Sequence, residues 1–210
     1  MTTLLKAETL SGSDWKRVRD IFKKGGIIAY PTETFYGLGV DPFNESAVKK
    51  LFQLKGRGFD KPISMLAKDK NMLLPVVEEI PPAAEKLIKK FWPGPLTIIF
   101  KAKKTVPSII TGSTGKIAVR ISSNPIAQKL LENINSPITT TSANPSGKKS
   151  PVTAKEVMDY FKDKIDLILD GGALSGKLGS TIVDVTEGDL KIIREGEIAA
   201  KTVIDSLKKV

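Results

Sequence analysis

The 210-residue chain contains neither cysteine nor histidine, and each absence excludes a class of chemistry. Without cysteine there are no disulfides, thiol nucleophiles or thiolate metal ligands. Without histidine there is no Ser-His-Asp triad, no imidazole base and almost no route to a zinc site. Any catalysis must therefore use carboxylates, lysine, arginine, hydroxyls, backbone groups or a hard cation such as Mg²⁺. Such groups suit reactions that proceed by positioning and charge.

The chain also lacks long apolar segments. No apolar run approaches the roughly 20 residues that span a bilayer, and the N-terminal sequence lacks the basic and apolar regions of a secretory signal. We therefore expect a cytoplasmic protein that does not associate with membranes. Apolar residues are 40% of the chain, which is enough for a packed core, and the length fits one domain over residues 1–210.

Positive charge is in excess. Lys and Arg total 33 against 23 Asp and Glu, for a net charge of +10. This surplus favours polyanionic partners such as nucleotides and RNA, although an ordinary lysine-rich surface would produce the same number. Aromatic residues are only 6% of the chain, which leaves few rings on which bases could stack.

Helical and strand patterns alternate along the whole chain. Apolar periodicity and capping residues predict helices at residues 14–24, 45–54, 82–91, 125–133, 153–161 and 198–208. Short apolar or β-branched runs predict strands at residues 27–30, 62–67, 96–100, 117–121, 137–141, 167–169, 181–185 and 190–193. The last two strands read as a hairpin, so we expect an α/β fold with a mixed sheet.

Two segments place polar or basic side chains where a strand or a helix ends. Residues 30–39, YPTETFYGLG, supply Thr32, Glu33 and Thr34 after a strand. Such groups bind a carboxylate or phosphate, or else cap their own turn. Residues 55–62, KGRGFDKP, bring three cations onto one loop. This loop is either a triphosphate clamp or a solvated basic loop.

Two further segments are rich in small polar residues. In residues 139–150, TTTSANPSGKKS, Ser142 and Asn144 alternate at a strand end, so both can face one ligand, although an ordinary turn looks similar. Residues 171–177 fit G-x-x-x-x-G-K, but Leu178 follows where a phosphate loop needs Ser or Thr, and a strand follows where it needs a helix. We reject a phosphate-loop NTPase and expect a wide turn that delivers Ser180 and Thr181 to a site.

Together these segments resemble the YrdC family of threonylcarbamoyl-AMP synthases, in its TsaC-type, single-domain form. The matching pieces are PTETFYGLG, KGR with the following KP, WPGPLT, AVR, TSANPSG, STIVD and REG, and they span nearly the whole chain. The hallmark pairs of this family are Lys-x-Arg and Ser-x-Asn, here Lys55/Arg57 and Ser142/Asn144. The resemblance implies a twisted mixed β-sheet with flanking helices and a basic concave face.

The resemblance also implies a reaction. Members of the family join L-threonine, bicarbonate or CO₂, and ATP into threonylcarbamoyl-adenylate and release pyrophosphate, with Mg²⁺ accompanying the ATP. A tRNA-modifying transferase complex then receives the intermediate, and direct contact with tRNA is possible. The chemistry needs no histidine, because it depends on holding reactants in line and stabilising charge on phosphates.

The matching positions imply roles for individual residues. Lys55 and Arg57 would be catalytic, and no protein side chain is assigned to the metal. Threonine would be bound by Thr34, Arg120, Ser142 and Ser180. The nucleotide would be bound by Arg57, Lys61, Lys116, Asn144 and Arg194. Outside the resemblance, Arg120 and Arg194 near strand ends could equally form structural salt bridges.

Two departures from the family matter. Longer members have a histidine in the segment after KP, where this chain has Leu66, so any threonine contact made there is lost or replaced. Longer members also have a second domain, so we expect the lid of a single-domain form to come from its own loops. Two alternatives remain: an RNA-binding module of the same fold, and a related carbamoyl- or nucleotidyl-transferring enzyme with another acceptor.

Overall fold

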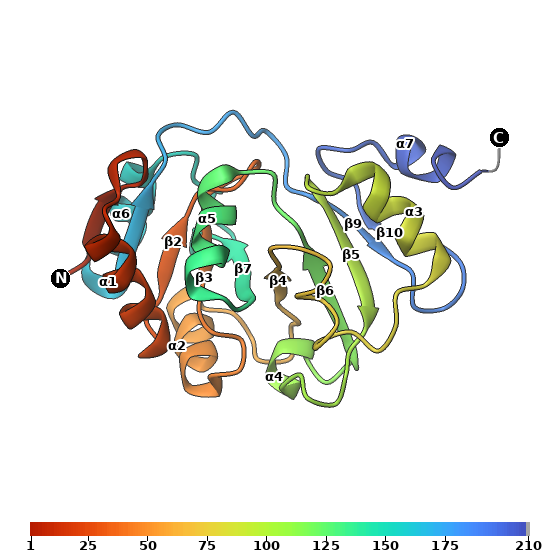
Figure 1. Cartoon of the computed structure of the whole chain (residues 1–210), viewed down its shortest axis with the longest axis horizontal. Coiled ribbons are helices and arrows are strands. Elements are labelled where there is room, and N and C mark those ends of the chain that lie inside the picture. Colours follow the sequence, from red (N-terminus) through yellow and green to blue (C-terminus); the bar gives the residue numbers. More distant parts are fainter. Residues whose placement is uncertain (209–210) are drawn as a thin grey trace.

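The computed structural model describes residues 1–208, in which ten strands form one twisted mixed sheet with helices on both faces (Figure 1). The strands are β1 (Thr3–Lys6), β2 (Ile28–Tyr30), β3 (Gly37–Gly39), β4 (Ser64–Leu66), β5 (Leu96–Lys101), β6 (Lys116–Arg120), β7 (Ile138–Ser142), β8 (Leu167–Asp170), β9 (Thr181–Asp184) and β10 (Lys191–Arg194). Their order is β1-β8-β2-β3-β7-β4-β6-β5-β9-β10. Pairs β1/β8, β8/β2, β4/β6 and β5/β9 are parallel and the others antiparallel, which confirms the predicted α/β class.

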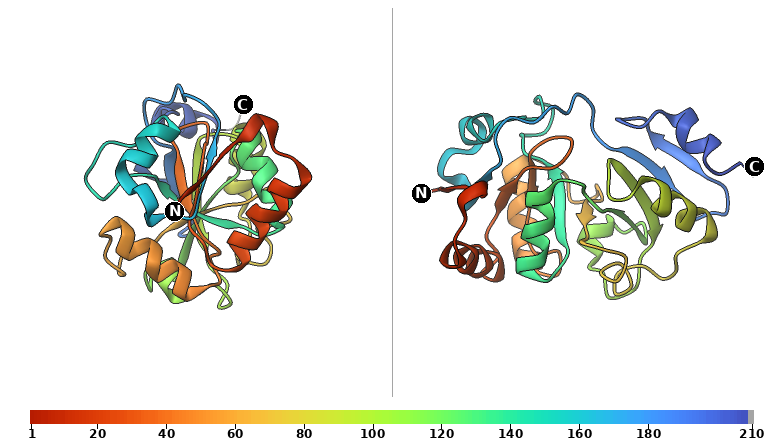
Figure 2. Two further views of the ribbon diagram at one scale, coloured as in Figure 1. Left: turned by 90° about the vertical axis from the view of Figure 1, so that its left-hand side faces the viewer. Right: turned by 45° about the horizontal axis from the view of Figure 1, so that its top comes forward.

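The helices are distributed unequally over the two faces. They are α1 (Gly12–Lys23), α2 (Glu45–Lys55), α3 (Pro82–Phe91), α4 (Ser108–Thr111), α5 (Pro125–Ile134), α6 (Ala154–Phe161) and α7 (Ala200–Asp205), with 3₁₀ turns at Ala7–Thr9 and Lys162–Lys164. Apolar residues of α2, α3, α4, α6 and α7 share one core with one face of the sheet. Only α1 and α5 pack on the other face, next to β2 and β8. An end-on view shows the sheet between α1 and α5 on one side and α2 and α6 on the other (Figure 2).

This asymmetry leaves part of the second face without a helix. Successive residues of a strand point to opposite faces. In the central strands Met65, Val119 and Ile98 therefore enter the larger core, while their neighbours Ala118, Arg120 and Thr97 point the other way. Among residues 1–208, no helix packs over β5, β6 and β9 on that second face, and these strands form the floor of a cavity.

Most helix boundaries follow the predicted caps. Asn44 caps α2 through a bond to the Ala47 amide, and Gly56 ends it in the left-handed conformation (φ 61°). The first helix differs from the prediction, because Ser11 rather than Ser13 is its cap. The Ser11 side chain and Asp14 form a reciprocal capping box, so α1 begins at Gly12.

Strand β3 was not predicted, because Gly37-Leu38-Gly39 resembles a turn in sequence. It lies between β2 and β7 and is antiparallel to both. A Cβ on Gly39 would lie 2.5 Å from the carbonyl oxygen of Thr139, and a Cβ on Gly37 would lie 3.4 Å from the Tyr30 ring. The glycines are therefore needed for close strand packing, not for chain reversal.

Within residues 1–208, no helix has the length and apolar character that crossing a bilayer requires. The last helix is shorter than the predicted range of 198–208, since α7 covers Ala200–Asp205.

Candidate active site

A cavity of about 620 Å³ lies over the open part of the sheet. Its floor consists of side chains from β5, β6, β7 and β9. Its sides come from the turn after β2, the loop before β4, the segment before β9 and the end of β10. Among the predicted site residues, those that line it are Thr34, Arg57, Arg120, Ser142, Ser180 and Arg194. The cavity thus brings together residues that are far apart in the sequence, such as Thr34 and Arg194, which are separated by 160 positions.

Arg57 reaches the cavity from the loop that follows α2. Its Nη2 donates to the carbonyl oxygen of Pro62 at 2.6 Å, and its guanidinium lies 5.8 Å from the centre of the Phe52 ring. Its Nε is buried without a hydrogen-bond partner. Burial lowers the pKa of this guanidinium, while the charge of Asp60 in the same loop acts in the opposite direction. Its Nη1 has no hydrogen-bond partner among residues 1–208, so this donor is available to an anionic ligand.

Lys55 lies behind the cavity and does not line it. Its side chain is buried, and Nζ donates to the carbonyl oxygens of Ser142 and Asn144. The Lys55 carbonyl oxygen in turn accepts from the amide of Ser146. The last residue of α2 therefore fixes the turn that follows β7.

The Lys55 ammonium should give a measurable pH dependence of stability. Burial, and secondarily the charge of Arg57, lowers its pKa from 10.5 to about 8. Between these values the unfolded chain binds more protons, so this group stabilises the fold as pH rises from about 8 to 10.5, and the contribution is lost below about 8. The difference in unfolding free energy between wild type and Lys55→Met should therefore move in favour of wild type by up to about 3 kcal/mol over that range. Denaturant titrations at three pH values would measure it.

The matched control is Lys50→Met, which removes an exposed lysine from the same helix. We expect its difference from wild type to stay flat over the same pH range. A flat difference for Lys55→Met as well would contradict a buried ammonium at this position.

Arg120 projects from the end of β6 and forms a buried network with the turn after β2. Its Nη1 donates to Glu33 Oε1 at 2.7 Å and to Thr34 Oγ1 at 3.3 Å. The second carboxylate oxygen of Glu33 accepts from Ser122. Thr32 completes the turn, with its hydroxyl 3.0 Å from that of Thr34. The Thr34 hydroxyl and the Arg120 guanidinium are thereby held side by side at the cavity.

Ser180 and Arg194 form the opposite side of the cavity. The Ser180 hydroxyl lies 2.8 Å from that of Thr97 on β5. Arg194 donates to the carbonyl oxygen of Ser180 from Nη2 at 2.6 Å and from Nε at 3.2 Å. Burial lowers the pKa of Arg194, and the charge of Arg120 lowers it further. A Cβ on Gly179 would lie 2.8 Å from Arg194 Nη2, so a side chain at this position would displace the guanidinium.

The connection from β8 to β9, residues 171–180, runs across the top of the molecule between its two halves (Figure 1). A Cβ on Gly176 would lie 1.8 Å from the carbonyl oxygen of Thr34, so backbone packs directly on backbone there. Glu197 accepts from the amides of Lys177 and Leu178 at 2.9 and 2.7 Å. The connection delivers Ser180 to the cavity and has a strand after it, which agrees with rejecting a phosphate loop.

Besides Lys55, four residues to which the resemblance gives a role or draws attention lie outside the lining of the cavity. Asn144 Nδ2 donates to the carbonyls of Pro145 and Lys148, so its side chain stabilises its own turn instead of facing the cavity with Ser142. Lys116 Nζ pairs with Asp184 at 3.0 Å and Glu187 at 2.9 Å. The two others are Lys61, exposed on its loop, and Leu66, which is buried in the smaller core in register with Arg120.

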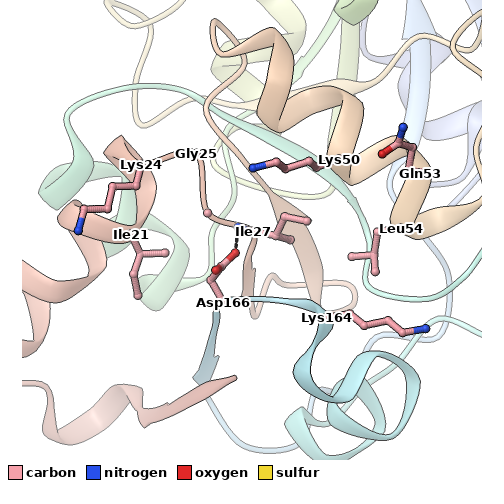
Figure 3. A pocket seen from close by; sticks show the side chains of 10 residues that line it. Ile21, Lys24, Gly25, Ile27, Lys50, Gln53, Leu54, Lys164 and Asp166 are labelled. Atoms are coloured by element: carbon pink, nitrogen blue, oxygen red, sulfur yellow. Dashed lines mark hydrogen bonds between the residues drawn. The ribbon is translucent and has the colours of Figure 1, made fainter. Parts of the chain in front are cut away.

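A second hollow, of about 560 Å³, lies at the start of β2 and is lined by three lysines (Figure 3). The side chains of Lys24 and Lys164 point away from each other and from its centre (Figure 3). The Asp166 carboxylate is bound to the amide of Ile27 at 2.7 Å, which is a structural contact. Because its charges diverge, this hollow does not compete with the cavity over β5 and β6 as the reaction site.

Several cavity or network residues were not assigned by the sequence. Glu33 was noted only as a polar side chain, and Ser122 and Glu197 were not noticed. Thr97 belongs to the WPGPLT segment, which was matched without a role. Tyr36 lines the cavity, and its hydroxyl donates to the carbonyl oxygen of Gly172 at 2.8 Å; burial raises its pKa to about 12. Their partners are more than 15 residues away in sequence, so no local pattern marks them.

Comparison with known proteins identifies a matching protein family. The family model for Sua5, YciO and YrdC proteins, described as "Telomere recombination", matches residues 20–196. A Pyrococcus abyssi protein named threonylcarbamoyl-AMP synthase is 41% identical over 192 residues, which are 90% of this chain and 56% of that protein. The chain therefore spans little more than half the length of this relative.

Two solved structures are similar over nearly the whole chain. The P. abyssi Sua5 structure complexed with L-threonine has a TM-score of 0.92 and 36% identity, and the match covers 99% of this chain and 61% of that one. The Escherichia coli YciO structure has a TM-score of 0.85 and 27% identity, covering 97% of this chain and 98% of that one. Both share the mixed sheet described above.

Proposed function

The chain belongs to the Sua5/YciO/YrdC family, and from this premise we propose that it condenses L-threonine, bicarbonate or CO₂, and ATP into L-threonylcarbamoyl-adenylate, with release of pyrophosphate. The observation that carries the proposal is one cavity lined by three arginines and several hydroxyls, in a chain without histidine. The name of the P. abyssi relative and the L-threonine in the Sua5 structure support the choice of substrates.

We assign the threonine half of the site to the Arg120 side of the cavity. A guanidinium beside the hydroxyl of Thr34 suits an amino-acid carboxylate, because arginine binds carboxylates through parallel donors. Ser142 and Ser180 would supply further hydroxyls to the amino acid. Leu66 is buried in the core and makes no such contact, so Thr34 and Arg120 take over any role of the histidine found in longer relatives.

We assign the nucleotide half to Arg57 and Arg194. Within residues 1–208 neither forms an ion pair with a carboxylate, so both charges are available to phosphates. Mg²⁺ would arrive with ATP as part of the substrate, since acidic side chains of the described residues do not cluster around an ion site. Lys61, which precedes the cavity-lining Pro62, is proposed to reach the phosphates from its loop.

Lys116 and Asn144 are proposed as further nucleotide contacts. Lys116 lies two residues before Ala118 on the same face of β6, and ATP would compete with Asp184 and Glu187 for its ammonium. Asn144 does not line the cavity, so its Nδ2 would have to leave the carbonyls of Pro145 and Lys148 in order to donate to a phosphate. Lys55 would contribute to catalysis through the turn that it holds, not by touching the reactants.

The proposed reaction balances with these groups. The threonine amine attacks the carbon of CO₂ and gives a proton to water, which yields a carbamate. From bicarbonate, the amine proton instead leaves with the hydroxide as water, and no net proton is released. A carbamate oxygen then attacks the α-phosphorus of ATP, the bond to the bridging oxygen breaks, and pyrophosphate leaves. The arginines stabilise charge on the phosphates and hold carbamate and α-phosphate in line. Carbamates are labile in water, so the site would have to exclude water during the reaction.

A pyrophosphate-release assay tests the proposal. We expect release from ATP only when both L-threonine and bicarbonate are present. Release that does not depend on threonine would contradict the proposed function. Equal rates with serine or another amine would instead indicate a related enzyme with a different acceptor.

The adenylate product is an activated acyl donor and needs an acceptor. We propose that a tRNA-modifying transferase complex in the cytoplasm receives it, with direct tRNA contact through the basic surface of this chain. A steep fall of tRNA affinity with salt concentration would be expected for such contact, because phosphate contacts release counterions.

A further inference from the structure

The three arginines of the cavity differ in their charge balance. Arg120 forms an ion pair with Glu33 at 2.7 Å. Neither Arg57 nor Arg194 has a carboxylate within ion-pairing distance among residues 1–208. Two guanidiniums therefore face the cavity without an ion-paired carboxylate, although the charge of Asp60 acts on Arg57 and Glu195 lines the same cavity. The third presents donors with almost no net charge.

Glu33 is built into the wall and does not enter the cavity. Its side chain is 13% exposed and that of Arg120 is 6% exposed. One carboxylate oxygen accepts from Arg120 and the other from Ser122, so both are occupied. Ser122 also accepts from the amide of Asn124, which caps α5. Glu33 is thus held between the end of β6 and the start of α5.

Arg120 keeps hydrogen-bonding capacity in spite of this pair. Both of its side-chain hydrogen bonds come from Nη1, so its Nη2 has no partner among residues 1–208, and the residue lines the cavity. Unlike the buried Nε, this Nη2 donor is available to a ligand in the cavity. A ligand with one carboxylate could satisfy it, whereas a polyphosphate is attracted mainly by net charge, which the Glu33–Arg120 pair lacks.

We propose that Glu33 is a positioning and specificity-determining residue that reserves Arg120 for a singly charged carboxylate and leaves polyphosphate to Arg57 and Arg194. This proposal rests on the proposed function for the identity of the amino acid, but its electrostatic content does not. Without the Glu33 charge, the Arg120 guanidinium would become a third uncompensated cation. Polyphosphate could then occupy the place of the amino acid and compete with it.

A purely structural role for Glu33 makes a different prediction. Because Ser122 and α5 share the network, simple loosening of the wall would weaken every ligand together. The proposal requires instead that two ligands respond in opposite directions. This contrast separates the two explanations.

Calorimetric titration of the folded protein with L-threonine and with inorganic tripolyphosphate provides the test. In Glu33→Gln the shape is kept, and the Ser122 hydroxyl can accept from the new amide where it formerly donated. We expect the Kd for threonine to rise by about tenfold, because Arg120 loses its orientation. We expect the Kd for tripolyphosphate to fall by roughly fivefold, because the cavity gains one positive charge.

Competition between the two probes gives a second readout. In wild type, saturating tripolyphosphate should leave the Kd for threonine nearly unchanged. In Glu33→Gln, saturating tripolyphosphate should raise the Kd for threonine further. Glu33→Asp keeps the charge on a shorter side chain and should restore weak tripolyphosphate binding. Glu132→Gln removes the same charge from the exposed surface of α5 and should change neither Kd.

The outcomes are decisive. Weaker binding of both probes, or unchanged binding of both, would overturn the proposal. Circular dichroism shows whether each variant is folded. If Glu33→Gln does not fold, the two Kd values of Glu33→Asp decide the question. The pyrophosphate-release assay on wild type fails independently if the proposed function is wrong. If the two Kd values shift in opposite directions but the wild type has no synthase activity, the role of Glu33 still holds. Only the identity of the carboxylate ligand would then change.

Discussion

Arg57→Ala should lower the rate of threonine-dependent pyrophosphate release by about 100- to 1,000-fold, the usual loss when one pre-placed donor to developing charge is removed. The arginine lines the cavity, has no ion-pair partner among residues 1–208, and has an Nη1 without a hydrogen-bond partner in the same residues. The free energy of unfolding should change little, because its protein contacts are one bond to Pro62 and the Phe52 ring. Steady-state kinetics with ATP varied would measure the effect.

Two comparisons sharpen this prediction. Arg57→Lys keeps the charge but loses the planar pair of donors, so it should recover only part of the rate. Arg17→Ala removes the same charge from α1, where the side chain bonds only to Thr3, and should not affect turnover. An unchanged rate in Arg57→Ala would remove this residue from the proposed site.

Among the single variants proposed here, Arg120→Met should lower the free energy of unfolding the most, by about 3–5 kcal/mol. The reason is that it leaves the Glu33 carboxylate buried without its cation. The same change should abolish saturation by threonine at accessible concentrations, since the proposed carboxylate contact is gone. Denaturant unfolding and threonine-dependent kinetics are the two measurements.

The double variant Arg120→Met/Glu33→Gln separates these two effects. Removing both charges eliminates the uncompensated carboxylate, so most of the lost stability should return. Threonine saturation should not return, because the guanidinium is still absent. Recovery of both properties in the double variant would show that Arg120 acts on the fold alone.

The absence of histidine restricts the chemical groups that line this cavity. Its polar lining consists of guanidiniums, hydroxyls and one carboxylate, Glu195. These groups bind and orient anions but are poor proton carriers at neutral pH, which agrees with a reaction limited by alignment rather than by acid–base catalysis. Leu66, in place of the histidine of longer relatives, packs into the core and leaves Arg120 and Thr34 to define that side.

The amino-acid sequence by itself determined most of the elements, but not β1, β3 or α4, and it determined the segments of the site. Local patterns suffice for these: Asn44 and Gly56 bound α2 through bonds to their own helix, and the β9–β10 hairpin follows from apolar runs around a short turn. The segments with Thr34, Arg57, Ser142 and Ser180 were recognised because polar and small residues gather at the ends of strands and helices. Charge and the missing histidine also restricted the chemistry before any fold was considered.

Only the tertiary structure decided which side chain of each segment faces the cavity. Lys55 and Arg57 are two residues apart, yet Lys55 turns to carbonyls 87 and 89 positions away, while Arg57 turns to the cavity. Ser142 and Asn144 divide in the same way, because the chain leaves the strand between them and its alternation of faces ends. The pairing of Glu33 with Arg120, 87 positions apart, likewise has no local signature. Burial, charge compensation and register depend on partners brought close by the whole sheet, and these set the roles of residues that the sequence could only group together.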